Sequence, residues 1–358
     1  MQTTDTWELC SFGEDGFIMH RADLLSALYD SFSATEKAKI LTGKKVSDIS
    51  SDENGVKVQC ADGTSYEGSI AIGADGVHSA ARKAIRSLAL KAGKPDVDGE
   101  NPFTTQFRML WFSAPRPARI RSARSAQSFN KTASVQLLLG KERCWIFLYE
   151  RLDRPTPKSE RVTYSEQDMF DFVEKWGHLT CEDDLPVREV FATRYKAGLI
   201  NLEEGVINQW HEGRICLVGD AAHKFTPNAG LGFNNGAQDV AVALNEIMRV
   251  VKADPNPTVP ALSAAFDKYQ SIRMEPLVKD YKASAVTTRY QTYETFVYWF
   301  IDRCLMRYLG FMQRGLLNLG VVDRVRIARP LEFLPGIEPF QGKTPWDFPM
   351  SQTIDLKR

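Results

Sequence analysis

The chain has 358 residues, of which 43% are hydrophobic and 25% are charged, and its 45 basic residues balance its 45 acidic residues. This balance, with no dense block of lysine and arginine, gives no electrostatic reason to expect a nucleic-acid partner, so a small, neutral partner is favoured. The length exceeds the usual size of a single core, which predicts two domains or one elaborated domain.

The six cysteines show no paired spacing typical of a zinc or redox motif. Several lie in apolar runs, so we expect reduced, buried thiols. The cysteines are Cys10, Cys60, Cys144, Cys181, Cys216 and Cys304. No apolar signal-peptide core is visible near the N-terminus, so we expect an intracellular protein, cytoplasmic or membrane-associated.

Leucines at helical spacing predict a helix over residues 21–31. Three short strands are expected next, separated by the tight-turn sequences Asn54-Gly55 and Asp62-Gly63. They span residues 46–51, 56–60 and 64–67. The pattern predicts a small antiparallel meander that leads into a strand over residues 69–73.

Between residues 102 and 200 the composition favours strands, with aromatic and branched residues in three runs. The expected strands are 103–112, 133–139 and 144–150. Residues 165–176 form an amphipathic helix candidate, because Met169, Phe172 and Trp176 share one face. This part of the chain predicts a second sheet.

Residues 215–218 form a short apolar run typical of a buried parallel strand, and Gly219 and Asp220 follow it directly. After the loop 227–232, a helix is expected to begin near Asn234 or Asn235. Its apolar residues at helical spacing are Val240, Leu244, Ile247, Met248 and Val251. A carboxylate at the end of a strand, next to a glycine-rich helix start, suits a sugar-like hydroxyl chain and an electron-rich ring.

An aromatic segment at residues 295–322 is interrupted by four charged residues, so a simple membrane span is not expected. The charges are Asp302, Arg303, Arg307 and Arg314. A helix packed on the main domain is favoured, and a basic amphipathic helix that touches a membrane or caps an apolar pocket stays open.

The five histidines are scattered and form no metal-binding pattern, so no metal is expected. His223, close to Asp220, is expected to be a hydrogen-bonded structural histidine.

Two motifs resemble those of the single-component FAD-dependent monooxygenases related to para-hydroxybenzoate hydroxylase. Gly219-Asp-Ala-Ala-His223 is similar to the second FAD motif of that family, and Gly73-Ala-Asp-Gly-Val-His-Ser-Ala-Ala-Arg82 to its middle motif. The helix that begins at Arg21 resembles a third family element. The sequence of residues 224–236 is most similar to that of a fungal branch that acts on natural products, the paxilline-type monooxygenases.

The resemblance implies FAD as cofactor and contacts to it from nine residues. They are Arg21, Asp75, Gly76, Arg82, Asp220, Gly230, Gly232, Phe233 and Asn234. Several have plainer alternatives: a turn former for Asp75, a solvated helix residue for Arg82 and a surface ion pair for Arg21. The fixed torsion of Pro227 is expected to shape the loop at the reactive edge of the flavin. Arg108 is a guess for a residue that faces the substrate, with outward solvation as its alternative.

The expected fold is α/β, with an incomplete FAD-binding Rossmann-like domain of parallel sheet and antiparallel meander, an inserted β-rich α+β substrate domain and a helical C-terminal segment. The FAD-binding domain is expected at 1–100 and 201–290, the substrate domain at 101–200 and the helical segment at 291–358. No Gly-x-Gly-x-x-Gly fingerprint precedes Gly73. We therefore expect roughly one hundred N-terminal residues of the nucleotide-binding half to be missing.

The resemblance implies that NADPH or NADH reduces FAD, that O2 forms a C4a-hydroperoxide on it, and that one oxygen atom reaches the substrate. Epoxidation of a prenyl chain on a terpenoid, meroterpenoid or indole-diterpenoid is the favoured reaction. Hydroxylation of a phenol by the same chemistry is the alternative within enzymes. The alternative that is not an enzyme is a remnant that cannot hold FAD.

Overall fold

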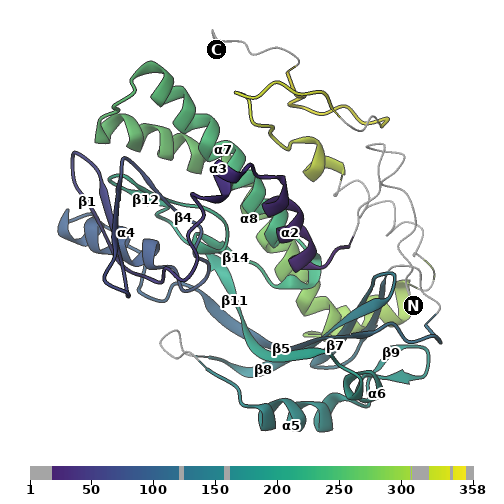
Figure 1. The fold of residues 1–358 in the computed structure, drawn as a ribbon. Coiled ribbons are helices and arrows are strands. Elements are labelled where there is room, and N and C mark those ends of the chain that lie inside the picture. Colours follow the sequence, from purple (N-terminus) through teal and green to yellow (C-terminus); the bar gives the residue numbers. More distant parts are fainter. Residues whose placement is uncertain are drawn as a thin grey trace.

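The computed structural model describes residues 18–120, 125–156, 162–306, 308, 322–338 and 342–351. A long helix, α8 (Val259–Gln291), runs from a part built on parallel strands to a six-stranded antiparallel sheet (Figure 1).

The first described elements are two helices, α2 (Arg21–Ser31) and α3 (Ala34–Lys37). The helix predicted at 21–31 is confirmed, and none of its residues is buried. Helix α3 begins with a capping box, in which Ser33 and Glu36 each accept the other's backbone N–H.

The predicted meander is confirmed as an antiparallel sheet in the order β1-β2-β3. Its strands are β1 (Val46–Ser51), β2 (Val56–Cys60) and β3 (Ser65–Gly68). At the first turn, the carboxylate of Asp52 accepts the backbone N–H groups of Asn54 and Gly55, which fixes the chain reversal locally.

Strand β4 (Ala71–Gly73) pairs in parallel with β13 (Ile215–Leu217), and β12 (His211–Glu212) pairs with the other edge of β13. The three residues of β13 are completely buried, as expected for a strand covered on both faces. Helices α4 (Ala80–Lys91), α7 (Gly232–Ala253) and α8 supply many of the other residues of this core.

Helix α7 begins at Gly232, two residues before the predicted Asn234. Its buried face is partly polar, because Asn235 and Asp239 are buried whereas Val240 is 42% exposed. The apolar spacing therefore located the helix but not the whole of its buried face.

The large sheet has the strand order β14-β11-β5-β8-β7-β6. Its strands are β5 (Thr104–Pro115), β6 (Ser125–Phe129), β7 (Ala133–Leu139), β8 (Arg143–Thr156), β11 (Lys196–Val206) and β14 (His223–Lys224). The three strands predicted between residues 102 and 200 correspond to β5, β7 and β8, whereas β6 and β11 were not predicted. Because β14 follows directly on the Gly219-Asp220 turn, the large sheet is joined to the parallel strands.

One face of the large sheet is covered by α5 (Glu166–Trp176), α6 (Val187–Ala192) and the hairpin of β9 (Thr180–Glu182) and β10 (Leu185–Pro186). Figure 1 shows α5 and α6 on the side of the sheet away from α8. The predicted amphipathic helix at 165–176 is confirmed as α5, whose Phe172 is buried against this face.

Near the C-terminus, α9 (Phe296–Phe300) continues into a π-helical turn, η3 (Ile301–Leu305). No residue of α9 is buried, and Phe296 is 72% exposed. Residue 307 and residues 309–321 of the predicted segment lie outside the described residues. Among the described helices, none combines the length and the apolar character needed to span a membrane.

Candidate functional site

The two motifs meet at the carboxyl ends of β4 and β13. Gly73 lies opposite Leu217 in the parallel register, and the N–H of Val218 donates to the carbonyl oxygen of Gly73 at 3.0 Å. The loop after β4 therefore lies beside the turn η1 (Gly219–Ala221). Carboxyl ends of parallel strands are the usual place for ligands in such sheets.

Two glycines let the backbone segments approach closely. A Cβ on Gly73 would lie 2.3 Å from the Cβ of Ala81, so only glycine lets α4 pack on this strand end. Gly219 has φ of +61°, and a Cβ there would lie 3.7 Å from the Cα of Gly236 in the first turns of α7. The strand ends and the start of α7 are thereby held close together.

The carboxylate of Asp75 accepts hydrogen bonds at the N-terminus of α4. Its Oδ2 accepts the N–H groups of Ala80 at 2.6 Å and Ala81 at 3.2 Å, and its Oδ1 accepts the hydroxyl of Ser79. The carboxylate thus satisfies free donors at a helix N-terminus. In the structure Asp75 shapes the loop that presents Gly76, and a direct contact to cofactor stays a prediction.

Arg82 joins the two motifs. Its side chain is 8% exposed, its Nη1 donates to the carbonyl of Ala221 at 2.8 Å, and its Nη2 donates to the carbonyl of Val77. The guanidinium lies over the ring of Phe103, 5.0 Å from its centroid. Burial lowers the pKa of Arg82, and the carboxylates of Asp75 and Asp98 oppose that change.

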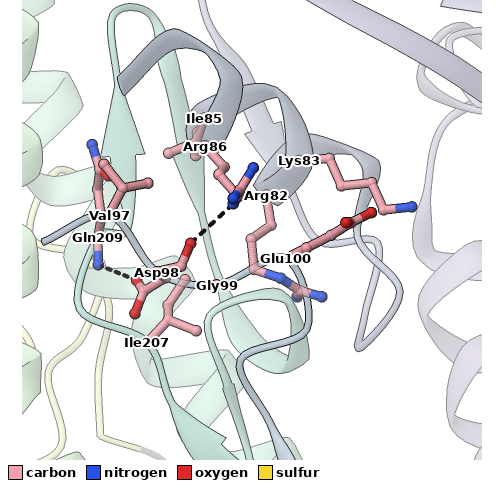
Figure 2. A pocket seen from close by; sticks show the side chains of 10 residues that line it. All are labelled: Arg82, Lys83, Ile85, Arg86, Val97, Asp98, Gly99, Glu100, Ile207 and Gln209. Carbon is pink, nitrogen blue, oxygen red and sulfur yellow. Dashed lines mark hydrogen bonds between the residues drawn. The ribbon is translucent and has the colours of Figure 1, made fainter. Parts of the chain in front are cut away.

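Figure 2 shows Arg82 on α4 beside the chain segment that contains Asp98. Arg86 donates to the carbonyl of Asp98 at 3.0 Å, and the Asp98 carboxylate accepts the N–H of Gln209. The Nε of Arg82 is buried and lacks a hydrogen-bond partner among the described residues. Arg82 is therefore a buried cation with an unpaired Nε–H between the two motif loops, and not a solvated helix residue.

Asp220 is partly exposed at the turn after β13 and forms an ion pair with Lys224. Its Oδ1 lies 3.9 Å from the position that a Cβ on Gly232 would occupy, so the carboxylate faces the start of α7. That helix start has no side-chain cap, which leaves N–H groups free for another acceptor. An uncapped helix start beside a carboxylate can hold a hydroxyl chain and a ring that gains negative charge.

Three further predicted residues line this helix start. Gly230 has φ of +67° and open space where a Cβ would lie. Phe233 is 65% exposed and Asn234 is exposed, so both are accessible to a ligand at the helix start. The residues present therefore fit the riboflavin end of FAD.

Asp239 is a functional residue that the sequence interpretation missed. It is completely buried, and its carboxylate accepts the N–H of Gly219 at 2.9 Å, a ring N–H of His223 and the Nε of Arg273 at 2.8 Å. Burial alone would raise the pKa of Asp239, but His223 and Arg273 lower it below the ordinary value. Asp239 thus fixes the turn that presents Asp220, and the expectation of a hydrogen-bonded His223 is confirmed.

Pro227 opens a short helical turn, η2 (Pro227–Ala229), whose neighbours are held on both sides. Thr226 is buried, and its hydroxyl contacts the hydroxyls of Ser284 at 3.0 Å and Thr288 at 2.6 Å. Asn228 is buried as well and donates to Gln291 at 2.6 Å. The side of α8 therefore keeps the Pro227 loop in place.

A cavity of about 560 Å³ lies between the motif loops and the edge of the large sheet. Val77, His78 and Arg82 come from the β4 side, Lys224, Phe225 and Pro227 from the β13 side, and residues of β5 and β11 from the sheet. Met109, Leu199, Ile200 and Leu202 are among the apolar residues from the sheet. The cavity is large enough for a drug-sized ligand.

One predicted site residue, Arg108, lies outside this cavity, and the flavin contact of another, Arg21, stays a prediction. Arg108 lies on the α5 face of β5, where it pairs with the buried Glu150 and its guanidinium carbon lies 5.1 Å from the ring centroid of Phe172. The structure does not bring it into the cavity. Arg21 is exposed at the first position of α2.

The described cysteines are free, as expected, and four are buried: Cys60, Cys144, Cys181 and Cys216. Burial raises the pKa of Cys144 to about 11 and that of Cys181 to about 12, so these thiols stay protonated near neutral pH. Within the described part of the chain, no cluster of three or more potential metal ligands occurs.

Comparison with known proteins places these features in a family. The sequence model of the FAD binding domain family matches residues 13–273. The FAD-dependent monooxygenase SAT1 of Stachybotrys chartarum is 39% identical over 198 residues, which are 55% of this chain and 66% of that protein. The FAD-dependent monooxygenase olcE of Penicillium canescens is 30% identical over 331 residues, which are 90% and 70% of the two chains. The FAD-dependent monooxygenase adrH of Penicillium rubens is 27% identical, with 88% and 65% covered.

The chain thus spans about two thirds of the length of these relatives. Among solved structures, Klebsiella pneumoniae HpxO complexed with FAD and uric acid is similar in fold, with a TM-score of 0.64 and 19% identity over 85% of this chain and 71% of that one. A salicylate hydroxylase substrate complex gives a TM-score of 0.58 and 19% identity, with 87% and 76% covered. At these identities the likeness concerns the fold alone.

Proposed function

Because this chain belongs to the FAD binding domain family, we propose that it acts in an FAD-dependent monooxygenase that uses NADPH or NADH and O2. The observation that carries this proposal is the meeting of both motif loops at the carboxyl edge of β4 and β13, beside the 560 Å³ cavity. FAD supplies the redox chemistry in such enzymes, since it takes two electrons from a nicotinamide and activates O2.

The residues of this chain hold and shield the reacting groups. Asp220 would accept hydrogen bonds from the hydroxyl chain of the cofactor, and the free N–H groups at the start of α7 would stabilise a ring that gains negative charge. Arg82, with its spare Nε donor, supplies positive charge between the motif loops. The Pro227 loop and the apolar sheet residues keep water from the oxygen-transfer step.

We propose a prenylated natural product as the substrate and epoxidation of its alkene as the reaction. Met109, Ile200 and Leu202 give the cavity an apolar side that suits an isoprenoid chain. Relatives named FAD-dependent monooxygenases come from fungi such as Penicillium canescens and Stachybotrys chartarum, which is compatible with a role in secondary metabolism.

Hydroxylation of a phenol is the second candidate, and one observation favours it. Tyr164 lines the cavity and donates its phenolic hydroxyl to Oδ1 of Asn201 at 2.7 Å. A tyrosine at this place can exchange hydrogen bonds with a phenolic substrate. Tyr164→Phe separates the two candidates, because it should lower turnover of a phenol strongly and turnover of a prenyl alkene little.

The test of the main proposal is a titration of the purified full chain with FAD, followed by visible absorption. We expect a bound-flavin spectrum, NADPH oxidation that increases on adding a prenylated substrate, and an epoxide product. Asp220→Ala should weaken FAD binding at least tenfold, whereas Glu275→Ala on the exposed side of α8 should leave it unchanged. A wild-type chain that binds no FAD in excess contradicts the proposal and favours a non-catalytic remnant.

A peripheral membrane contact through residues 295–322 is a further part of the proposal. Its support is the exposure of Phe296 at 72% and Val297 at 60% on α9. The double change Phe296→Ser and Val297→Ser should reduce co-sedimentation with phosphatidylcholine–phosphatidylserine vesicles. Equal co-sedimentation of the wild type and the double variant would contradict the membrane contact.

A further inference from the structure

Buried hydrogen bonds link the large sheet to the Pro227 loop, and we call this link the polar strut. Tyr149 on β8 is completely buried and donates its hydroxyl to Oε1 of Gln136 on β7 at 3.0 Å. The Nε2 of Gln136 donates to the carbonyl oxygen of Asn228 at 3.1 Å. Tyr149, Gln136 and Asn228 are all less than 10% exposed, so these bonds are made away from water.

Each end of this strut belongs to a wall of the cavity. Tyr149 lies opposite Met109 in the β5–β8 register, and both pack in one cluster with Leu202. Met109 and Leu202 line the cavity from the sheet. Asn228 directly follows Pro227, which lines the cavity from the motif loop.

Asn228 has little freedom apart from this contact. Its amide Nδ2 donates to Gln291 at 2.6 Å, and its Oδ1 lies 3.1 Å from the hydroxyl of Thr288, so its side chain is held by α8. Its carbonyl oxygen is left for Gln136. The loop is thus held by α8 on one side and by the sheet on the other.

We infer that Gln136 is a positioning residue for the proposed monooxygenase reaction, because it sets the distance between the Pro227 wall and the substrate-facing sheet. This inference rests on the proposed function. A substrate packed on Met109 and Leu202 is then kept at a fixed distance from the loop at the reacting edge. Small displacements at such a site lower productive transfer more than binding.

Gln136→Met tests the inference, because methionine has similar length but makes neither hydrogen bond. Tyr149→Phe is a milder variant that keeps the bond from Gln136 to Asn228. Ser134→Ala is the matched control on the same strand, since the Ser134 hydroxyl is buried without a hydrogen-bond partner among the described residues.

The first readout needs no cofactor. Amide hydrogen exchange of the peptide over residues 225–231 should become about tenfold faster in Gln136→Met and less so in Tyr149→Phe, with no change in Ser134→Ala. The second readout uses the FAD-loaded chain. The hydrogen peroxide formed per NADPH oxidised should increase severalfold in Gln136→Met, while the Kd for FAD stays within about twofold of wild type.

Unchanged exchange and unchanged peroxide yield in Gln136→Met, in a chain that binds FAD normally, would overturn this inference and leave the proposed function intact. A wild-type chain that binds no FAD overturns both. If Gln136→Met does not fold, the same two readouts on Gln136→Leu, which also makes neither hydrogen bond, decide the matter.

Discussion

At the scale of single residues, the site depends most on Asp239. Its buried carboxylate holds the N–H of Gly219 and balances the charge of Arg273, which is 6% exposed. Removing one partner of a buried pair leaves the other charge without compensation. Without the Asp239 carboxylate, the turn that presents Asp220 should therefore lose its anchor, and the fold should lose stability at the same time.

Asp239→Asn should lower the free energy of unfolding by about 3 kcal/mol, because the Arg273 guanidinium stays buried without its counter-charge. Urea denaturation measures the change. The control is Glu275→Gln, which breaks an exposed pair with Lys279 and should cost less than about 0.5 kcal/mol. Equal losses in the two variants would show that Asp239 contributes no more than a surface charge.

The free energy of unfolding should also depend on pH through the Asp239 carboxylate. The folded-state pKa of Asp239 is lowered, so its contribution is present above the unfolded value near 3.9 and is lost as the pH falls through the folded value. The stability gap between wild type and Asp239→Asn should therefore narrow as the pH falls from about 5 to 3. A gap that widens in acid would contradict the assigned direction.

The sequence identified Asp75 and Asp220 because each stands inside a motif with a strand before it and a helix after it. It could not assign a role to Asp239, which lies in the helix that follows the second motif. Its partner Arg273 lies on a different helix, 34 residues further along the chain, and only the fold brings the two together. The glycine at 73 was recognised as part of a motif, but its contact with Ala81 depends on how α4 packs.

At the scale of elements, that contact predicts how the strand end responds to a side chain. Gly73→Ala would place a Cβ 2.3 Å from Ala81 and 2.9 Å from Leu217, so β4, α4 and β13 would have to separate. We expect a loss of about 2 kcal/mol or more in the free energy of unfolding. Thermal denaturation followed by circular dichroism measures it.

Gly99→Ala is the control for this change, since a Cβ there meets nothing within 4 Å. It should leave the melting temperature within about 1–2 °C of wild type. A similar loss in both variants would mean that the cost comes from glycine content and not from crowding at the strand end.

Local chemistry explains which elements the sequence predicted well. The meander β1–β3 was predicted because its turns are set by short-range bonds such as those from Asp52 to Asn54 and Gly55. Helix α8 was not predicted, although it is the longest described helix. Its buried residues include Arg273, Asp280 and Thr288, so apolar periodicity is faint where the partners are polar.

At the scale of the whole molecule, α8 connects the parallel-strand part to the large sheet. Its first half supplies Leu262, Phe266 and Tyr269 to the core around β13. In its second half, Arg289 pairs with Glu204 of β11 at 2.6 Å, and Glu204 is 2% exposed. We therefore expect the two parts to unfold together.

Arg289→Met should let the parallel-strand part and the large sheet unfold separately, because Glu204 would keep a buried charge without its partner. Thermal unfolding of wild type should give coincident transitions by near-UV and far-UV circular dichroism, and the variant should give two. Lys279→Met, at an exposed position of the same helix, should keep a single transition. Coincident transitions in Arg289→Met would show that the pair does not couple the two parts.

The shared helix also has a consequence for the fate of the protein in a cell. A ligand that binds only the folded state stabilises everything that unfolds with its site, by about 2.7 kcal/mol at one hundred times its Kd. Because the loop around Pro227 and the large sheet are both held by α8, flavin bound at the loop would also protect β6, the far edge strand of that sheet, from proteases. The half-life of the large sheet would then follow the riboflavin supply, although that sheet holds none of the predicted cofactor contacts.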